Sequence, residues 1–465
     1  MSTLWAVAAL SLSGVMPARW ATNDPVRVAL LVLPAALILG SLSVVITLLV
    51  PVPLWLAWGA VVIAAAFCSL VLLRRRGRSA APDAREGWVE ALTGLLPLGV
   101  ALVLSCAHFT VAGLGWDARS IWVLHARLLT GEGAALVDSL RLPVYAFSHP
   151  DYPEGSSFAI ALGWVVGGGV DYRQAQLIIG ALTIAAVGLA GHEVARVGTG
   201  RAGRLMAAGL GSALVMQALI ASGGFVSNGY VDTLWAALAV AAVAAGLVAP
   251  ADHTNLRVTV LLCVAAASVK SDALPIALAV IALTALRLRW ARQREPAAPP
   301  DGATWHIVAV GIAAVSLWPV VVAALGIPGR YSLAAAMRGL LANDPTVVGR
   351  LEPSLTAIER LVPLAVPALA LIALGALALR SRIRATGVGG PLWTVAVGAL
   401  GLAALLVAYL ADPADIDFLL LTSASRAVIF LRLALTVAVL VLPLQYCRGV
   451  AWARGPYQRP GPALT

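Results

Sequence analysis

Long apolar runs alternate with short polar ones along this chain. Each run of about 20 apolar residues is long enough to cross a bilayer core of ~30 Å as an α-helix. The pattern predicts an all-α polytopic membrane protein with about 12 to 13 transmembrane helices. The clearest spans lie near residues 27–50, 54–73, 93–112, 176–197, 203–222, 230–249, 305–326, 361–379, 391–411 and 427–446.

Shorter apolar runs complete this pattern. The runs at 258–269 and 273–286 flank the polar triplet "KSD", and together they predict a hairpin of two short helices. The run at 4–16 is short for a membrane span, which leaves open whether it crosses the bilayer or lies in its interface.

Composition supports the membrane interpretation and narrows the partners. Hydrophobic residues make up 60% and charged residues 12% of the chain, outside the range of soluble domains. The four cysteines form no CxxC pair, so no disulfide framework or zinc site is indicated. The net charge of +10 comes largely from basic loops on one side of the predicted spans. This side is therefore expected to be cytoplasmic, and the charge reflects topology and not nucleic-acid binding.

The predicted sidedness places two long loops outside the cytoplasm, at 113–175 and 327–360. Since the span at 176–197 must enter from outside, the apolar stretch 156–170 cannot cross the bilayer and is expected to form a helix at the outer surface. We divide the chain into N-terminal helices (1–92), a central module (93–290) and C-terminal helices (291–465).

The stretch "GLGWDARSIWVLHARLL" opens the first outer loop. Asp117 follows the span 93–112, where a carboxylate can accept a proton or bind a cation beside the membrane surface. Arg119, His125 and Arg127 follow along a predicted short helix. The alternative is that these charges only solvate a surface helix.

The segment "SHPDYPEG" is stiffened by two prolines. Each proline fixes its own φ and favours an extended conformation at the residue before it, here His149 and Tyr152. Asp151 is thereby held in advance for a substrate, which lowers the entropy lost on binding. A proline-capped helix start is the alternative. Asp117 and Asp151 could share the role of base. The two carboxylates could also bind a metal, which leaves open whether a divalent cation serves as a cofactor.

Three further segments place ionisable residues beside apolar helices, where such residues need water, a partner or a substrate. "ASVKSDALP" contains Lys270 and Asp272, and its ammonium suits a phosphate leaving group; a solvated hairpin tip is the alternative. "LLLTSASRAVIFLRLAL" contains Arg426 and Arg432, for which lipid phosphate is a natural partner. Asp232 in "NGYVDTLW" lies near an outer helix end.

Common soluble-enzyme motifs are missing from the sequence. We find no GxxxxGK[ST] phosphate loop, no Rossmann glycine pattern, no HExxH and no GxSxG. Nucleotide-driven transport and nucleotide-sugar chemistry of the soluble type therefore have no support.

Together, "GWDARSIWVLHAR", "HPDYPEG", "VKSDAL" and "TSASR" are similar to segments of the GT-C superfamily of integral-membrane glycosyltransferases. Within this superfamily, the chain is most similar to bacterial proteins that resemble the protein O-mannosyltransferases and the lipid A aminoarabinose transferases. The resemblance covers residues 93–290 and, more weakly, the tail through "TSASR". It implies an all-helical fold, a polyprenyl-phosphate-linked sugar donor and a carboxylate, here Asp117, that acts on the acceptor hydroxyl. Protein O-mannosyltransferases carry Asp-Glu where this chain has Asp117 and Ala118, which weakens the case for a protein acceptor.

These observations predict a glycosyltransferase of the bacterial cytoplasmic membrane, with its site on the extracytoplasmic face and an acceptor that is a cell-envelope glycan or lipid. Asp117, with Asp151, is expected to take the acceptor proton as a lipid phosphate departs, with inversion at the anomeric carbon. A transporter or flippase of lipid-linked sugars and a scaffold protein are the alternatives. The expected substrate and phosphate contacts are Arg119, His149, Tyr152, Asp232, Lys270, Asp272, Arg426 and Arg432.

Overall fold

The computed structural model describes residues 2–50, 52–75, 87–106, 113–131, 133–198, 200–223, 226–293, 302–329, 333–363, 365–378, 390–412 and 414–454. Within these ranges the chain is all-helical, as predicted, and contains no strand. Several basic stretches that support the predicted sidedness, and part of the second predicted outer loop, lie outside the described residues: 76–86, 294–301, 330–332, 379–389 and 455–465.

The elements follow one another along the chain as short and long helices. They are α1 (Ser2–Ala21), α2 (Pro25–Leu49), α3 (Leu54–Arg75), α4 (Gly87–Cys106), the π-helix η2 (Ala118–Val123), α5 (Leu124–Leu129), α6 (Gly133–Arg141), the 3₁₀-helix η3 (Pro143–Ser148), α7 (Gly155–Gly167), α8 (Tyr172–Ala195), α9 (Gly200–Ser222), α10 (Asp232–Val243), the π-helix η4 (Ala244–Val248), α11 (His253–Val269), α12 (Ala273–Arg292), α13 (Gly302–Ala324), α14 (Leu333–Leu341), α15 (Pro345–Val348), α16 (Leu351–Leu361), α17 (Ala365–Ala378), α19 (Gly390–Ala411), α20 (Ile416–Ala427) and α21 (Ile429–Arg454).

Eight stretches among the described residues are long and apolar enough to cross a membrane, which gives the chain the architecture of a polytopic membrane protein. They are Pro25–Leu49, Leu54–Arg74, Tyr172–Ala195, Ala202–Ser222, Ala273–Arg292, Gly302–Ala324, Leu392–Ala411 and Ile416–Leu442. Four further apolar helices are shorter: Thr93–Ser105, Gly155–Gly167, Asp232–Val248 and His253–Val269. The lengths of these helices do not decide how many of them cross a membrane, so the total of about 12 to 13 spans stays a prediction.

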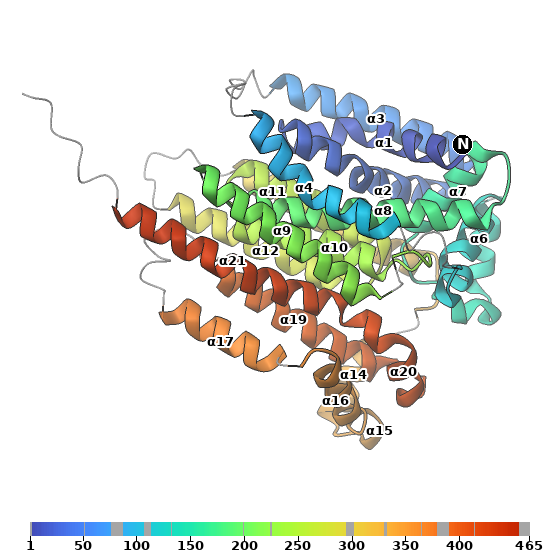
Figure 1. The fold of residues 1–465 in the computed structure, drawn as a ribbon. Helices are drawn as coiled ribbons and strands as arrows, with labels where there is room; N and C mark the ends of the chain where they lie inside the picture. The colour runs from blue at the N-terminus through green and yellow to red at the C-terminus, as the bar shows by residue number, and fades with distance from the viewer. Residues whose placement is uncertain are drawn as a thin grey trace, which may run out of the picture.

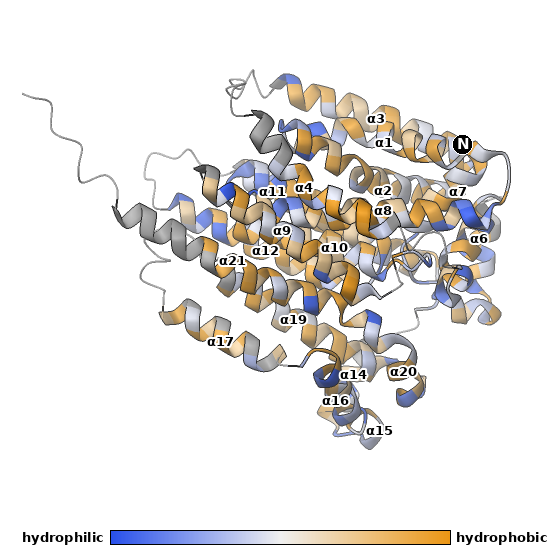
Figure 2. Ribbon diagram, in the orientation of Figure 1, coloured by the Kyte–Doolittle hydropathy of each residue, from blue (hydrophilic) through white to orange (hydrophobic). Residues whose placement is uncertain are grey.

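The long helices lie alongside one another in a bundle (Figure 1). The small helices α5 and α6 and helix α20 gather toward one end of this bundle, at the right in Figure 1. Hydrophobic residues prevail along the long helices (Figure 2). The molecule is therefore an apolar bundle. We call the end at which α5, α6 and α20 lie the loop end.

Aspartates set the starts of several helices. Asp24 accepts hydrogen bonds from the backbone N–H groups of Val26 and Arg27, and Pro25 occupies the first position of α2. The N-caps of α8, α11 and α20 follow the same rule with Asp171, Asp252 and Asp415. Because these caps satisfy N–H groups that the helix leaves open, they fix where each apolar segment begins.

Helix α10 runs through the centre of the bundle. All residues of Asp232–Val243 are buried, and α10 packs against α8, α11 and α21. A helix that is apolar on every side is expected to be surrounded by other helices. The polar residue at its first position, Asp232, is therefore placed in the interior of the loop end.

Helix α7, predicted to lie at the outer surface of the membrane, is buried among other helices over most of its length. Its residues from Gly155 to Trp164 are all buried, and it packs against α1, α2 and α8. A Cβ atom on Gly155 would lie 2.5 Å from the carbonyl oxygen of Ser268, so only glycine allows this approach to α11. An apolar helix that cannot span is also stabilised by burial inside the protein, and the position of α7 relative to the membrane surface stays a prediction.

The predicted hairpin around "KSD" is confirmed. Helices α11 and α12 pack against each other, and the chain turns between them at Lys270, Ser271 and Asp272. Both helices are longer than their predicted apolar cores, because polar residues extend each of them at the other end of the bundle. The turn brings Lys270 to the loop end.

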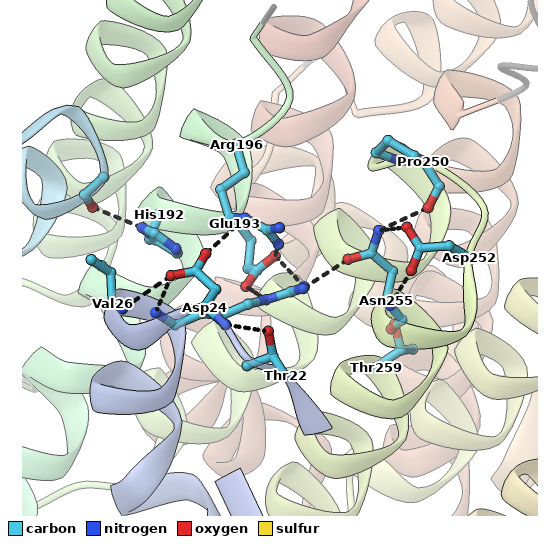
Figure 3. A network of polar contacts seen from close by, with 12 residues as sticks. Thr22, Asp24, Val26, His192, Glu193, Arg196, Pro250, Asp252, Asn255 and Thr259 are labelled. Carbon is cyan, nitrogen blue, oxygen red and sulfur yellow. Dashed lines mark hydrogen bonds and ion pairs between the residues drawn. The ribbon is translucent and has the colours of Figure 1, made fainter. Parts of the chain in front are cut away.

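A buried polar network joins α2, α8 and α11 at the other end of the bundle (Figure 3). Two N–H groups of Arg27 donate to the carboxylate of Glu193, Nε–H to Oε1 at 2.7 Å and Nη2–H to Oε2 at 2.8 Å. Its Nη1–H donates to Asn255 Oδ1 at 2.8 Å. The side chains of Arg27 and Glu193 are fully buried. Such a bidentate pair fixes geometry, and loss of either partner would leave a buried charge without compensation. The network therefore holds three helices in register far from the loop end.

Candidate functional site

Five charged side chains from four separate segments form one continuous series of ion pairs, here called the charged cluster. Arg426 Nη1 contacts Asp117 Oδ2 and lies 3.4 Å from Asp232 Oδ2. Lys270 Nζ lies 2.8 Å from both Asp232 Oδ1 and Asp272 Oδ2. All five were predicted as site residues from their separate motifs, and the structure brings them together.

The side chain at the centre of the cluster is buried, and the side chains at its two ends are partly exposed to solvent. The side chain of Asp232, which bridges the two cations, is 6% exposed, whereas those of Asp117 and Asp272 are 26% and 33% exposed. Lys270 and Arg426 are 13% and 10% exposed. Asp232 therefore acts as an inner support for two cations, and the outer carboxylates are the members that solvent or a substrate can reach.

Helix geometry explains why these charges lie where they do. Asp232 begins α10, and a carboxylate is favourable at the positive end of the helix dipole. Arg426 lies in the last turn of α20, where a cation is favourable, and its Nη2 donates to the Thr422 carbonyl at 3.1 Å. Asp117 precedes the π-helix η2 but makes no side-chain capping hydrogen bond. Its carboxylate is thereby left to pair with Arg426.

Aromatic rings support both cations. The Arg426 guanidinium lies 4.5 Å from the centroid of the Tyr230 ring, and Lys270 Nζ lies 5.6 Å from that of Tyr152. Both distances are typical of cation–π contacts. Trp122 and His149 stack on Tyr152 with centroids 5.7 Å and 4.4 Å away. Tyr152 therefore contacts Lys270 of the charged cluster, and His149 packs on the Tyr152 ring; both were predicted as site residues.

Lys270 keeps its charge in this setting. Burial by itself would lower the pKa of the ammonium, because a charge loses hydration in the interior. The carboxylates of Asp232 and Asp272 outweigh this effect and raise the pKa above its ordinary value. Lys270 is therefore a permanent cation near neutral pH.

Asp151 is fixed through its backbone. Its carbonyl oxygen accepts hydrogen bonds from Ser271 Oγ at 3.3 Å and from Trp318 Nε1 at 2.9 Å. The "SHPDYPEG" segment is thus tied to the Lys270 turn and to α13. The shared role predicted for Asp117 and Asp151 stays a prediction.

His149 differs from its predicted extended conformation. Its φ of 51° and ψ of 68° are left-handed. It ends the 3₁₀-helix η3, and its N–H bonds to the Ala146 carbonyl while the chain reverses toward Pro150. The preference imposed by the proline is outweighed here by the need to turn the chain and to place the imidazole on Tyr152.

A buried imidazole holds the same segment at both ends. His125 Nδ1 lies 2.8 Å from Glu154 Oε1, and its Nε2 lies 3.1 Å from Ser148 Oγ. All three residues are fully buried. Sequence analysis missed this arrangement, which we call the His125 clamp, and allowed His125 to be a solvated surface charge. A signal was present in Glu154, an acidic residue between Pro153 and an apolar helix.

Arg119 and Arg432 form none of the ion pairs of the charged cluster. Arg119 is exposed and lines a cavity of about 750 Å³ between η2, α5 and the start of α8. Arg432 Nε donates to the Leu361 carbonyl at 3.0 Å and borders a separate, mostly apolar cavity of about 520 Å³. The substrate or phosphate contact predicted for each of them stays a prediction.

The described residues contain no group of three or more His, Cys, Asp or Glu side chains arranged to hold a metal ion. The carboxylates of the charged cluster are instead paired with nitrogen cations.

Comparison of the chain with models of protein families, with curated proteins and with solved structures finds no match. The residues and their geometry are therefore the basis for assigning a function.

Proposed function

We propose that the charged cluster is the reaction centre of a membrane glycosyltransferase, which moves a sugar from a polyprenyl-phosphate-linked donor to a hydroxyl of a glycan or lipid acceptor. The observation that carries the proposal is the convergence of Asp117, Asp232, Lys270, Asp272 and Arg426 at one end of an apolar bundle. An apolar bundle suits the polyprenyl tail, and two adjacent cations suit the phosphate at its head.

The two cations provide the phosphate site in this proposal. Asp232 holds Lys270 and Arg426 on either side of one carboxylate, so both can face the same phosphate group. A phosphate that approaches from solvent competes with the more exposed partners, Asp117 and Asp272, while the buried Asp232 stays in place. Cations fixed in advance near a departing phosphate stabilise the charge that develops on it.

Displacement of Asp117 from Arg426 supplies the base. The freed carboxylate accepts the proton of the acceptor hydroxyl as the hydroxyl oxygen bonds to the anomeric carbon. The bond between that carbon and the phosphate oxygen breaks, and its electron pair leaves with the lipid phosphate. A single displacement inverts the anomeric configuration. Lys270 keeps its proton throughout, so the step needs one base.

The same resemblance and charge distribution lead us to propose a bacterial cytoplasmic membrane, with the loop end on the extracytoplasmic side. A transporter of lipid-linked sugars would use the charged cluster to bind the phosphate without breaking a bond. Among the residues that the structure describes, no contact favours that alternative over transfer, and the two functions differ in whether a carboxylate base is needed.

The test is sugar transfer by purified protein in nanodiscs, supplied with a panel of radiolabelled polyprenyl-phosphate sugars and an envelope extract as acceptor. Asp117→Asn is expected to lower the transfer rate by about 10²- to 10⁴-fold, because it removes the general base. The matched control is Asp138→Asn, which neutralises a 79% exposed carboxylate of α6 and should transfer at the wild-type rate. Equal transfer by Asp117→Asn and wild type, at equal abundance and melting temperature, would contradict the proposal.

A further inference from the structure

Arg432 places a charge inside an apolar helix. It lies in the first turn of α21, within the stretch Ile416–Leu442 that is long and apolar enough to cross a membrane. Its Nε and Nη2 both donate to the backbone carbonyl of Leu361, the last residue of α16. Among the described residues, none accepts a hydrogen bond from Nη1 and none offers a carboxylate to the guanidinium. A charge in a membrane-spanning segment needs a partner.

The cavity of about 520 Å³ beside Arg432 follows one face of α21. The residues of α21 that line it recur three or four positions apart and so form a single stripe: Arg432, Leu435, Thr436, Val439 and Leu440. Such a stripe extends about 12 Å along the helix axis. The other walls come from α9 and from the connection between α16 and α17. No acidic residue is among the described residues that line the cavity, so the charge of Arg432 is its only full charge.

The charged and the apolar parts of this cavity lie at different depths. Helix α21 runs from the loop end toward the other end of the bundle (Figure 1), so Arg432 lies nearest the loop end and Val439 and Leu440 lie deeper. The side chain of Ile220 in the α9 wall is 71% exposed, and that of Val439 is 53% exposed. Exposed apolar side chains on membrane-spanning helices face lipid, so the cavity opens toward the bilayer. An occupant can therefore enter from the bilayer with its charged group toward the loop end.

We propose that this cavity binds an anionic phospholipid of the bilayer, with the phosphodiester on Arg432 and an acyl chain along the apolar part of the α21 stripe. One guanidinium matches the single negative charge of a phosphodiester, and its planar fork suits phosphate oxygens. Basic pockets between membrane helices recognise lipid headgroups in this way. The site is separate from the charged cluster, because Arg426 pairs with Asp117 and Asp232 and does not line the cavity. The proposal therefore does not depend on the glycosyltransferase function.

The test is lipid binding by the full chain, purified in detergent and titrated with dioleoylphosphatidylglycerol in native mass spectrometry. The neutral probe is dioleoylglycerol, which has the same two chains and no phosphate. Arg432→Gln removes the cation, and its matched control Arg360→Gln removes an exposed arginine of α16 that does not line the cavity. Val439→Trp fills the apolar part and leaves the Arg432 hydrogen bonds intact, so it tests the site even where Arg432→Gln fails to fold. Its control is Val310→Trp, at an exposed valine of α13 that does not line the cavity.

We expect wild type to bind phosphatidylglycerol at least about tenfold more tightly than dioleoylglycerol, because only the first probe offers a phosphate to the guanidinium. Arg432→Gln should lose this preference. Val439→Trp should bind phosphatidylglycerol about tenfold more weakly, since the indole takes the space of the acyl chain. Both controls should bind like wild type. Equal binding of the two probes by wild type, or unchanged binding of phosphatidylglycerol by either cavity variant, would overturn the proposal.

A competition separates the bilayer lipid from the lipid of the proposed donor. Undecaprenyl phosphate, added to wild type at a concentration equal to that of phosphatidylglycerol, should leave most of the phosphatidylglycerol bound. Displacement of most of it would overturn the proposal in favour of a polyprenyl phosphate in the cavity. Asp117→Asn should bind phosphatidylglycerol like wild type, since Asp117 does not line the cavity. The lipid site and the glycosyltransferase assignment can therefore fail independently.

Discussion

At the residue scale, Asp232 organises the charged cluster. It is the most deeply buried of the five side chains and pairs with both cations. The outer carboxylates contact one cation each. Loss of Asp232 would therefore leave two partly buried cations with weaker compensation, whereas loss of an outer carboxylate would leave the centre intact.

Asp232→Asn is expected to lower the free energy of unfolding by about 3 kcal/mol, the usual range for breaking a buried ion pair. Asp272→Asn, whose carboxylate is 33% exposed, should cost less than about 1 kcal/mol. Denaturant titration in mixed micelles measures both. A smaller effect for Asp232→Asn than for Asp272→Asn would contradict the arrangement.

The pH dependence of stability tests the state of Lys270. Its pKa is raised in the folded protein, above the value of ~10.4 expected for the unfolded chain. Its stabilising contribution is therefore complete below about pH 10 and is lost as pH rises through the folded pKa. The stability difference between wild type and Lys270→Met should be constant from about pH 6 to 9. A difference that shrinks within that window would mean that burial, and not the carboxylates, determines the pKa.

Residue chemistry was predictable where a motif broke an apolar pattern, as with Asp117, Lys270 and Arg426. The partner of each residue was not, because residues 117 and 426 meet only through tertiary packing. The sequence also left His125 open to an exposed role, because its pairing with Glu154 depends on the chain reversal at His149. The position of Arg119 and Arg432 outside the ion pairs of the cluster likewise depends on which face of a helix meets the bundle.

At the element scale, the His125 clamp links α5 to both ends of the "SHPDYPEG" segment. Ser148 precedes this segment's turn and Glu154 precedes α7, so one imidazole fixes the loop that carries Tyr152. Tyr152 in turn supports Lys270. The clamp is therefore a positioning device that acts on the charged cluster through an aromatic ring.

A double-mutant cycle measures the clamp. His125→Ala alone is expected to lower the free energy of unfolding by about 1 to 3 kcal/mol, because it leaves the fully buried Glu154 carboxyl without its partner. His125→Ala combined with Glu154→Ala should cost less than the sum of the two single changes, with a coupling of about 1 to 3 kcal/mol. Strict additivity of the unfolding free energies would show that the two side chains do not interact.

Helices were predictable from apolar runs, and the α11–α12 hairpin followed from a polar triplet between two such runs. The burial of α7 was not predictable from the same pattern, since an apolar stretch too constrained to span can face either lipid or protein. The close approach of Gly155 to Ser268 shows that this stretch packs against protein and not lipid.

At the scale of the whole molecule, two polar assemblies lie at opposite ends of an apolar bundle. The Arg27–Glu193–Asn255 network ties three helices at one end, and the charged cluster occupies the loop end. The membrane architecture follows from hydropathy in both the sequence and the structure. Which end faces the cytoplasm follows only from the basic loops and stays a prediction.

Cysteine labelling tests that sidedness. Asp138→Cys in α6 and Gln293→Cys after α12 replace exposed residues at the two ends of the bundle in a background without other cysteines. A membrane-impermeant maleimide added to intact cells should label the first and not the second. The reverse pattern would place the charged cluster on the cytoplasmic side and remove the extracytoplasmic acceptor.

The central claim is that the charged cluster breaks and forms a glycosidic bond. The most direct measurement supplies vesicles containing the purified wild-type protein with radiolabelled polyprenyl-phosphate sugars and an envelope acceptor, and follows transferred sugar and translocated donor in one experiment. The account predicts labelled acceptor with the anomeric configuration inverted relative to the donor. Donor that crosses the bilayer with its sugar still attached, and no labelled acceptor for any sugar in the panel, would contradict it.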